Sequence, residues 1–272
     1  MRVLYLEGDR VAMRYLSGTF HKMGVDHRAI LPGEPLPRSL SDFQAVVISN
    51  YPRLLLQELE PLIVQASAQA GAGLLMAGGP NSFGRGGYAD SALAALLPVE
   101  LTQGDDRVRA AGGVFLEVKL PHHPLLRGLD LREPLTIVGH NRFQRCALSS
   151  EILCGRAFER RGRSGWQVSE ESLPMLVVRE SVDGAMGRGA ALATSFGPPW
   201  SGGLTEWGAT RHRLAIDAQA HLEVGEGYAV FVLNLMRWLC GEKVLFRGHE
   251  GWGELPEEFL ADGAPVVRAK GR

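Results

Sequence analysis

The sequence of residues 73–84 is Gly73-Leu74-Leu75-Met76-Ala77-Gly78-Gly79-Pro80-Asn81-Ser82-Phe83-Gly84. Its short apolar run predicts a buried strand over residues 73–77, because strands of a parallel sheet are covered on both faces. The glycines that follow predict a tight turn, since glycine adopts backbone conformations that other residues avoid. Strand ends of this kind, where loops and helix N-termini converge, are where α/β proteins bind ligands.

The rest of the first hundred residues alternates between strand and helix patterns. Apolar spacing predicts strands over residues 3–6, 26–31 and 43–49 and helices over residues 11–23 and 54–70. Gly24 occupies a helix C-cap position, and Pro61 predicts that the second helix is kinked or built from two short pieces. This alternation predicts an α/β fold with a parallel sheet, helices on both faces and right-handed crossovers.

After about residue 101 the pattern changes to strands without long helices between them. These strands are predicted over residues 113–118, 135–138, 152–156, 175–178 and 190–196. An amphipathic helix is then predicted over residues 228–240. We therefore expect a single domain over residues 1–245 with an elaborated second half, followed by an arm or tail over residues 246–272.

Composition limits the partners. The chain has 272 residues with 29 basic and 30 acidic side chains, a net charge of −1, so we expect neither nucleic acid nor a membrane surface as partner. The longest apolar-rich segment, residues 228–240, contains Asn234 and Arg237 and is shorter than the about 18 residues of a membrane span. The N-terminus reaches Glu7 after a very short apolar stretch, which is unlike a signal peptide, so a cytoplasmic protein is expected.

Further motifs accompany the glycine-rich stretch. They are Gly86-Gly87-Tyr88, Leu96-Leu97-Pro98-Val99, His123-Pro124-Leu125-Leu126, Gly139-His140-Asn141, Pro174-Met175-Leu176-Val177-Val178 and Gly187-Arg188-Gly189. Together, over roughly residues 1–241, the chain resembles the glutamine amidotransferase-like family of unassigned function, related to class I glutamine amidotransferases and to ThuA-like proteins. The resemblance implies a flavodoxin-like parallel sheet flanked by helices, with ligand chemistry at the carboxyl ends of its strands.

The chain departs from the active members of this class at the catalytic positions. Class I amidotransferases carry a cysteine nucleophile on a tight strand-to-helix turn and a histidine and a glutamate from a late strand. Here the turn has Gly78 and Gly79, and the late strand ends in Thr194 and Ser195. Without a thiolate there is no route to a glutamyl thioester. We therefore expect a pseudoenzyme without glutaminase activity, which binds a small molecule or acts as an interaction module.

The three cysteines are the next candidates for a replacement nucleophile. Cys146, Cys154 and Cys240 are widely spaced and form no C-x-x-C pair, so neither a disulfide framework nor a zinc knuckle is expected. Cys154 lies in a predicted strand and Cys240 ends a predicted helix. Buried structural thiols are therefore the favoured interpretation.

Ser82 is the one candidate for a different nucleophile. Pro80-Asn81-Ser82-Phe83-Gly84 distantly resembles the G-x-S-x-G elbow of hydrolases, with proline in place of the first glycine. A hydrolase that uses Ser82 with a downstream histidine is the alternative function. The pattern favours a structural role instead, in which Asn81 and Ser82 cap a helix or bond the loop backbone.

A ligand site is expected where the strands end, on residues that follow strands or belong to the glycine-rich loop. The candidate ligand-binding residues are Asp9, Asn50, Gly78, Gly79, Asn81, Ser82, Gly86, Gly87, Asn141 and Trp200. The loop glycines allow close approach of a small anionic ligand or of a neighbouring loop, and both remain open. His140 and Asn141 form either part of a polar site or a structural pair.

Metals and cofactors have no convincing motif. Adjacent histidines such as His122 and His123 point to opposite sides of an extended segment, so they do not readily share a metal ion. We expect neither a metal nor a cofactor. Apolar side chains in the tail (Phe246, Trp252 and Phe259) would be poorly buried in an isolated tail, which makes a homo-oligomer a further possibility.

Overall fold

The computed structural model describes residues 1–132, 135–160, 165–181, 186–215 and 221–242. The main sheet has the order β2-β1-β3-β4-β12-β11-β9-β6-β7, with β10 paired to β9. Its strands are β1 (Arg2–Glu7), β2 (Asp26–Ile30), β3 (Ala45–Ser49), β4 (Gly73–Ala77), β6 (Arg107–Val118), β7 (Leu135–Asn141), β9 (Ser150–Arg160), β10 (Trp166–Val168), β11 (Leu173–Arg179) and β12 (Gly189–Leu192).

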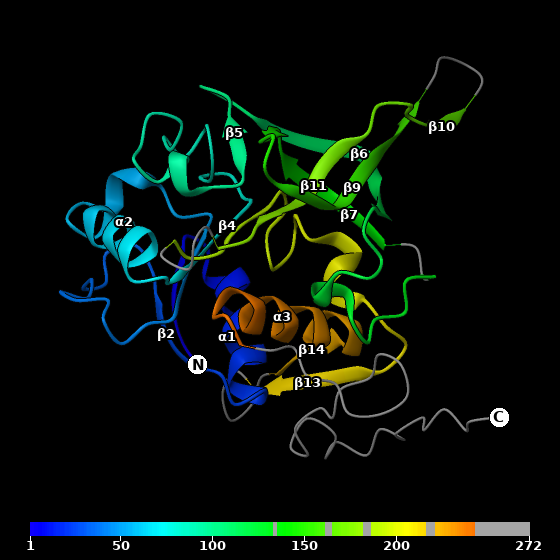
Figure 1. The fold of residues 1–272 in the computed structure, drawn as a ribbon. Helices are drawn as coiled ribbons and strands as arrows, with labels where there is room; N and C mark the ends of the chain where they lie inside the picture. The colour runs from blue at the N-terminus through cyan, green and yellow to red at the C-terminus, as the bar shows by residue number, and fades with distance from the viewer. Residues whose placement is uncertain (133–134, 161–164, 182–185, 216–220, 243–272) are drawn as a thin grey trace.

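The strands from β2 to β12 are parallel neighbours. Every residue of β3, β4 and β12 is buried, because helices cover both faces of this half of the sheet. Helices α1 (Arg10–Lys22) and α3 (Glu226–Leu239) pack side by side, and α2 (Leu59–Gln69) lies on the other side of the parallel strands (Figure 1). The order β2-β1-β3-β4-β12 is the flavodoxin-like order, so the predicted fold class is confirmed.

The elaborated second half is an antiparallel extension of the same sheet. Strands β11, β9, β6 and β7 follow β12 in antiparallel pairing. The extension curls back on itself, because the backbone N–H of Asn141, at the end of β7, donates to the carbonyl of Ala193, just after β12, over 2.9 Å. The end of β7 therefore lies at the carboxyl edge of the parallel strands.

Local signals explain both ends of α1. The Asp9 carboxylate accepts hydrogen bonds from the amides of Val11 (2.7 Å) and Ala12 (2.9 Å), so it caps the helix N-terminus. Gly24 follows the C-cap with a φ of +65°, which glycine adopts without a steric penalty. The helix predicted over residues 11–23 is thus confirmed, with each boundary shifted by one residue.

The sequence predicted that the helical segment around Pro61 is either kinked or built from two short pieces. The structure confirms the second alternative. A short 3₁₀ segment, η1 (Arg53–Leu55), is separated from α2 by residues 56–58. Pro61 lies in the first turn of α2, where its missing N–H has no helical partner to lose. The helix therefore needs no kink.

Several strand boundaries differ from those expected. The strand predicted over residues 190–196 ends at Leu192, because Ala193 then donates to Met175 and accepts from Asn141. Conversely, β6 begins six residues before the predicted Gly113. Its pairing register with β7 shifts between Arg109 and Val114, where Gly113 has a φ of +84°, and such a bulge breaks the alternation that predicts a strand.

The remaining elements are short and were not predicted. They are β5 (Val99–Leu101), β8 (Phe143–Arg145), β13 (Arg211–Ala215), β14 (His221–Gly225), η2 (Ala94–Leu96), η3 (Pro124–Leu126) and η4 (Gly202–Glu206). β5 pairs with β8, and β13 pairs with β14, each as a separate antiparallel pair. Elements of this length carry too few residues for a periodic pattern.

Helix α3 is buried on almost all sides, since it packs against α1, β4, β14, η3 and η4. Its one buried amide, Asn234, donates to the carbonyls of Leu125 (3.2 Å) and Arg127 (2.8 Å). The predicted helix over residues 228–240 is confirmed and starts two residues earlier. Among the helices that the structure describes, none has the length and apolar character needed to cross a membrane.

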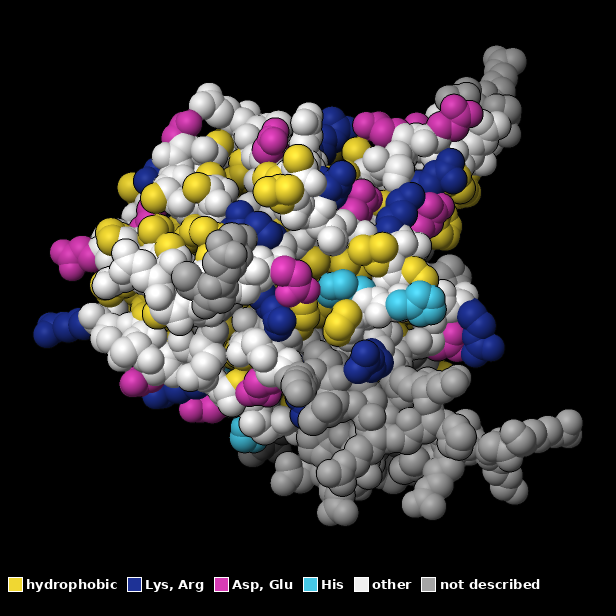
Figure 2. Space-filling view, viewed as in Figure 1, with side chains coloured by type: hydrophobic (Ala, Val, Ile, Leu, Met, Phe, Trp, Pro, Cys, Tyr) yellow, Lys and Arg dark blue, Asp and Glu magenta, His cyan; other side chains and the backbone are white. Residues whose placement is uncertain are grey.

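The visible surface matches the balanced composition. On the face shown in Figure 2, Lys and Arg side chains are interspersed with Asp and Glu side chains. The arm or tail predicted over residues 246–272 lies outside the described residues, and so do Phe246, Trp252 and Phe259. The division into one domain and a tail therefore stays a prediction.

Candidate functional site

The turn after β4 has no room for a side chain. A Cβ atom on Gly78 would lie 2.0 Å from the carbonyl oxygen of Ala193, and one on Gly79 would lie 2.5 Å from the Cβ of Asn50. Gly79 also has a φ of +152°. The N–H of Gly78 points to the carbonyls of Leu192 (2.8 Å) and Thr194 (2.9 Å). Ala193 is held at the end of β12 by hydrogen bonds to Met175 and Asn141, so a larger residue at Gly78 would force the backbone to shift.

All three cysteines lie away from this turn. Cys154 is within β9, where its Sγ lies 3.8 Å from the Glu117 carboxylate, and Cys146 follows β8. Cys240 caps the end of α3, and burial raises the pKa of its thiol to about 12. Burial also raises the pKa of the Cys146 thiol. Raised thiol pKa values oppose thiolate formation, which is the opposite of what a nucleophile requires.

Side chains from two other segments, those of Asn141 and Asp106, hold the glycine-rich loop in place. The Asn141 Oδ1 accepts from the Gly79 amide (2.9 Å), and its Nδ2 donates to the Asp106 carboxylate (3.1 Å). The same carboxylate accepts from the backbone amides of Gly84 (3.0 Å) and Arg85 (3.2 Å). Buried amides thus find side-chain partners where no strand can supply them.

Ser82 belongs to this network. Its hydroxyl donates to the carbonyl of Ala77 (2.6 Å) and accepts from the backbone amide of Asn50 (2.9 Å), and its side chain is fully buried. The residue Asn50 adds a second link, because its Oδ1 accepts from the Asn81 amide (2.9 Å). No histidine is a partner of Ser82 among the described residues, so its hydroxyl serves two backbone groups.

The predicted ligand residues lie near the carboxyl edge of the parallel strands. Some belong to the glycine-rich turn itself, and others belong to neighbouring segments. The carboxylate of Asp9 caps the N-terminus of α1. The preceding residue, Gly8, packs closely against Asn50, because an added Cβ at that position would lie 1.7 Å from the Asn50 carbonyl oxygen. Gly86 accepts from the Arg53 amide (3.0 Å), and Gly87 follows it with a φ of +82°.

Trp200 packs against β7, whose end lies at the same edge of the sheet. Its carbonyl accepts from the amides of Val138 and Gly139 (both 3.1 Å). A Cβ on Gly139 would lie 2.6 Å from the indole ring, so the glycine allows Trp200 to lie flat against the strand. A role in ligand binding stays a prediction for all of the predicted ligand residues.

Glu7 and Asp106 are buried acids that the sequence interpretation did not single out. The Glu7 carboxylate accepts from the Tyr5 hydroxyl (2.6 Å) and the Asp9 amide (2.9 Å). Burial raises the pKa of Glu7 to about 7, although the hydroxyls of Tyr5 and Ser49 and the Asp9 amide oppose this shift. An acid directly after the apolar run of residues 3–6 was the available signal for Glu7. Asp106 had none, because its partners are distant in sequence.

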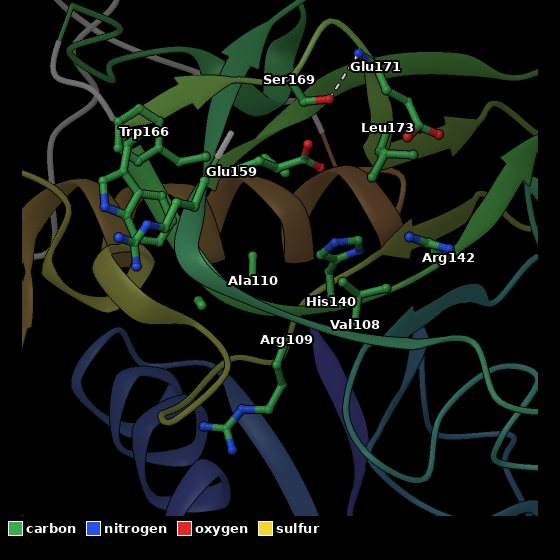
Figure 3. A pocket seen from close by; sticks show the side chains of 14 residues that line it. Val108, Arg109, Ala110, His140, Arg142, Glu159, Trp166, Ser169, Glu171 and Leu173 are labelled. Atoms are coloured by element: carbon green, nitrogen blue, oxygen red, sulfur yellow. Dashed lines mark hydrogen bonds between the residues drawn. The ribbon is translucent and has the colours of Figure 1, made fainter. Parts of the chain in front are cut away.

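A pocket of about 300 Å³ lies beside the end of β7 on the antiparallel half of the sheet (Figure 3). Its walls come from β6, β7, β9, β10, β11 and the segment before β11. His140 and Arg142, the neighbours of Asn141 on either side, both line it, as do Glu159, Trp166 and Glu171. The pocket therefore adjoins the network around the glycine-rich loop.

His140 has an unusual position in this pocket. Its side chain is buried, with Nδ1 lying 3.4 Å from the carbonyl oxygen of Asn141, whereas Nε2 has no hydrogen-bond partner among the described residues. Burial lowers the pKa of His140. Since a carbonyl only accepts, we assign the proton of the neutral imidazole to Nδ1, which leaves Nε2 as an unused acceptor.

An aromatic pair forms one wall of the pocket. The rings of Phe158 and Trp166 are stacked, with centroids 5.6 Å apart and planes at 7°. Gly112 makes this possible, because a Cβ at that position would lie 2.5 Å from the Trp166 ring. Trp166 is 47% exposed, so it combines a fixed orientation with an accessible surface.

Across residues 1–242 and apart from the gaps named above, no group of three or more His, Cys, Asp or Glu side chains could hold a metal ion.

The family of the chain follows from its sequence over more than half its length. Residues 56–217 match the GATase1-like family, described as "putative glutamine amidotransferase". The chain belongs to this glutamine amidotransferase-like family. The match includes the turn at Gly78 and Gly79, neither of which carries a nucleophilic side chain. The further resemblance to the ThuA-like group stays a prediction.

Solved structures resemble this amidotransferase-like protein in fold. The cytoplasmic protein STM3548 from Salmonella typhimurium is 19% identical with a TM-score of 0.65, and the cytoplasmic protein STM1381 from Salmonella typhimurium LT2 is 20% identical with a TM-score of 0.66. Each comparison covers 88% of this chain and 99% of the other. A search of curated proteins found no significant match.

Proposed function

We propose that this amidotransferase-like protein does not hydrolyse glutamine and instead binds a small molecule. The observation that carries the first part is the packing of the turn after β4. Glutamine hydrolysis in class I enzymes needs a thiolate at this turn to form an acyl intermediate. Here the positions of Gly78 and Gly79 exclude any side chain, because Cβ atoms would overlap Ala193 and Asn50.

The test is glutamate release from glutamine by the purified full-length protein, with an active class I amidotransferase assayed beside it. We expect a rate equal to that of the buffer alone. Saturable hydrolysis that disappears in Cys146→Ser, Cys154→Ser or Cys240→Ser would overturn the proposal, because one of these thiols would then be reaching the amide.

The binding role is supported by the pocket beside β7. A buried imidazole with an unused acceptor, an aromatic wall and exposed charged groups are features of ligand sites. A thermal-shift screen with metabolites of several chemical classes tests this role. A reproducible, saturable rise in Tm is expected for at least one class, and a screen without any such rise would count against binding.

The alternative is a hydrolase with Ser82 as nucleophile. The hydroxyl of Ser82 is engaged by Ala77 and Asn50, so it would have to leave two backbone partners before attacking a substrate. This makes a structural role the better supported one. A hydrolytic activity that Ser82→Ala abolishes while the fold is retained would reverse the preference.

A cytoplasmic location without nucleic-acid or membrane partners remains part of the proposal. Its support is the net charge of −1, the mixing of charges in Figure 2 and the description of the two similar bacterial proteins as cytoplasmic. A homo-oligomer through residues 246–272 also stays a prediction. Sedimentation of the full chain and of a chain ending at residue 245 would test it.

A further inference from the structure

We propose that the pocket beside β7 binds a small, neutral, hydroxyl-rich ring compound of the monosaccharide or cyclic-polyol class. Three observations carry this inference: the unused acceptor of His140, the aromatic wall at Trp166, and the mixture of charged groups at the rim. It rests on the binding role proposed above and adds to it the place and the chemistry of the ligand.

The acceptor requires a donor from the ligand. The imidazole Nε2 of His140 is buried without a partner, while its Nδ1 faces the Asn141 carbonyl. A buried polar atom without a hydrogen bond is costly, and a ligand hydroxyl would satisfy it. In Figure 3 the imidazole lies below Glu159 and Leu173, and His140 is one of the residues that line the pocket.

The aromatic wall favours a ring with a flat, weakly polar face. Trp166 is held against Phe158 and Gly112, so its indole has a defined orientation before any ligand arrives. A preoriented aromatic surface binds the C–H face of a saturated ring with little loss of side-chain entropy. A linear polar molecule would leave this surface unused.

The charges at the rim favour a neutral ligand. Arg142 and Arg160 line the pocket together with Glu159 and Glu171, and Figure 3 shows Arg109 directed away from His140. An anion would meet the two carboxylates, and a cation would meet the guanidinium groups. Hydroxyl groups both donate and accept, so one neutral polyol can use all of these side chains.

The size of the cavity agrees with this class. A volume of about 300 Å³ is at the lower end of small-molecule pockets. A single sugar ring fits this space, whereas a nucleotide or an oligosaccharide would extend beyond it.

The experiment is a titration of the full-length protein with D-glucose, D-galactose, D-mannose and myo-inositol, and with glycine and L-serine as zwitterionic comparators. Binding is measured by calorimetry and by the ¹⁵N resonance of the His140 imidazole. We expect saturable binding of at least one neutral polyol with a Kd of about 1 mM or below. The Nε2 resonance of His140 should shift on addition of that compound, because its lone pair gains a hydrogen bond.

Variants test the site. Trp166→Ala, at a half-exposed position, should weaken binding roughly tenfold, and His140→Phe, which keeps an aromatic ring but removes both nitrogens, should weaken it by about as much. Val168→Ala is the matched control: it lies on the same strand and is exposed to a similar degree, but does not line the pocket, so it should leave the affinity unchanged. Circular dichroism establishes that each variant is folded.

Three results would overturn the inference. They are an absence of polyol binding up to about 50 mM, binding of glycine or L-serine without any polyol, and equal affinities in Trp166→Ala and Val168→Ala. Each of these would leave the proposed binding function intact if a metabolite of another class still raised the Tm. Glutamine hydrolysis, by contrast, would contradict the proposed function itself.

Discussion

The side chain of Asn141, at the end of β7, accepts a hydrogen bond from the backbone amide of Gly79, just after β4, over 2.9 Å. The two residues come from opposite halves of the sheet. β7 is the last strand of the antiparallel extension and β4 belongs to the parallel half. This bond therefore helps to close the curled sheet at the carboxyl edge of the parallel strands.

Asn141→Ala should destabilise the fold strongly. The substitution leaves the Gly79 N–H without a partner and removes a donor to the Asp106 carboxylate, all in a buried region. Leaving buried polar groups unpaired costs about 2–4 kcal/mol in the free energy of unfolding. Urea denaturation measures this loss. Gln144→Ala, at an exposed position of the adjacent β8, serves as the control and should change stability little.

Asp106→Asn should loosen the glycine-rich loop. The Asp106 oxygens accept from Gly84, Arg85 and Asn141, and an amide nitrogen in place of one oxygen would face a donor instead of accepting from it. We expect a loss of about 2 kcal/mol in unfolding free energy and faster amide hydrogen exchange at Gly84 and Arg85. The neighbouring Asp105→Asn, on the surface, should affect neither observable, and similar effects of both variants would disprove the role of Asp106.

Glu7 should make the protein less stable as the pH rises. Burial raises its pKa from an ordinary value of 4.5 to about 7 in the folded state. Between these two values the folded state binds more protons than the unfolded state, so unfolding free energy falls with increasing pH and levels off above the folded pKa. The expected total contribution is about 3 kcal/mol.

The comparison with Glu7→Gln isolates this effect. Glutamine keeps the size of the side chain and cannot ionise, and the Tyr5 hydroxyl can accept from its amide. Denaturation of both proteins across about pH 4.5 to 8 should show the wild type losing stability relative to the variant as pH rises. Parallel pH profiles would mean that Glu7 titrates at its ordinary pKa.

Gly78→Cys should not create a glutaminase. A Cβ at this position would lie 2.0 Å from the Ala193 carbonyl, so the backbone of the sheet would have to shift. We expect a drop in Tm of about 10 °C or more, consistent with a loss of several kcal/mol, and no glutamate release. Gly104→Cys is the control, because that position has a φ of +88° but open space around it. It should cost only the smaller conformational penalty.

The parallel half of the fold was accessible from the sequence because its signals are local. The strands β1, β3 and β4 contain continuous apolar runs, and Asp9 and Gly24 mark the ends of α1. The spacing between these strands fits βαβ units. Each of these signals depends on residues within a few positions of one another. Burial on both faces of the sheet then follows from the alternation of strands and helices.

The antiparallel half was predicted less completely because its geometry depends on distant contacts. The bulge at Gly113 interrupts the pattern of β6, and the closure of the sheet depends on Asn141 meeting Ala193 and Gly79. No local periodicity of the sequence encodes these long-range contacts. The same reason explains why the roles of Asp106 and the pocket around His140 emerge only from the three-dimensional arrangement.

The central claim is that no cysteine of this protein can attack a glutamine-like substrate. Its most direct test is the intact mass of the full-length protein after exposure to a glutamine analogue bearing an electrophilic diazoketone, which alkylates amidotransferase nucleophiles. An unchanged mass is predicted, with an active amidotransferase labelled in parallel. One stoichiometric adduct that peptide mapping assigns to Cys146, Cys154 or Cys240, and that excess glutamine prevents, would contradict the claim.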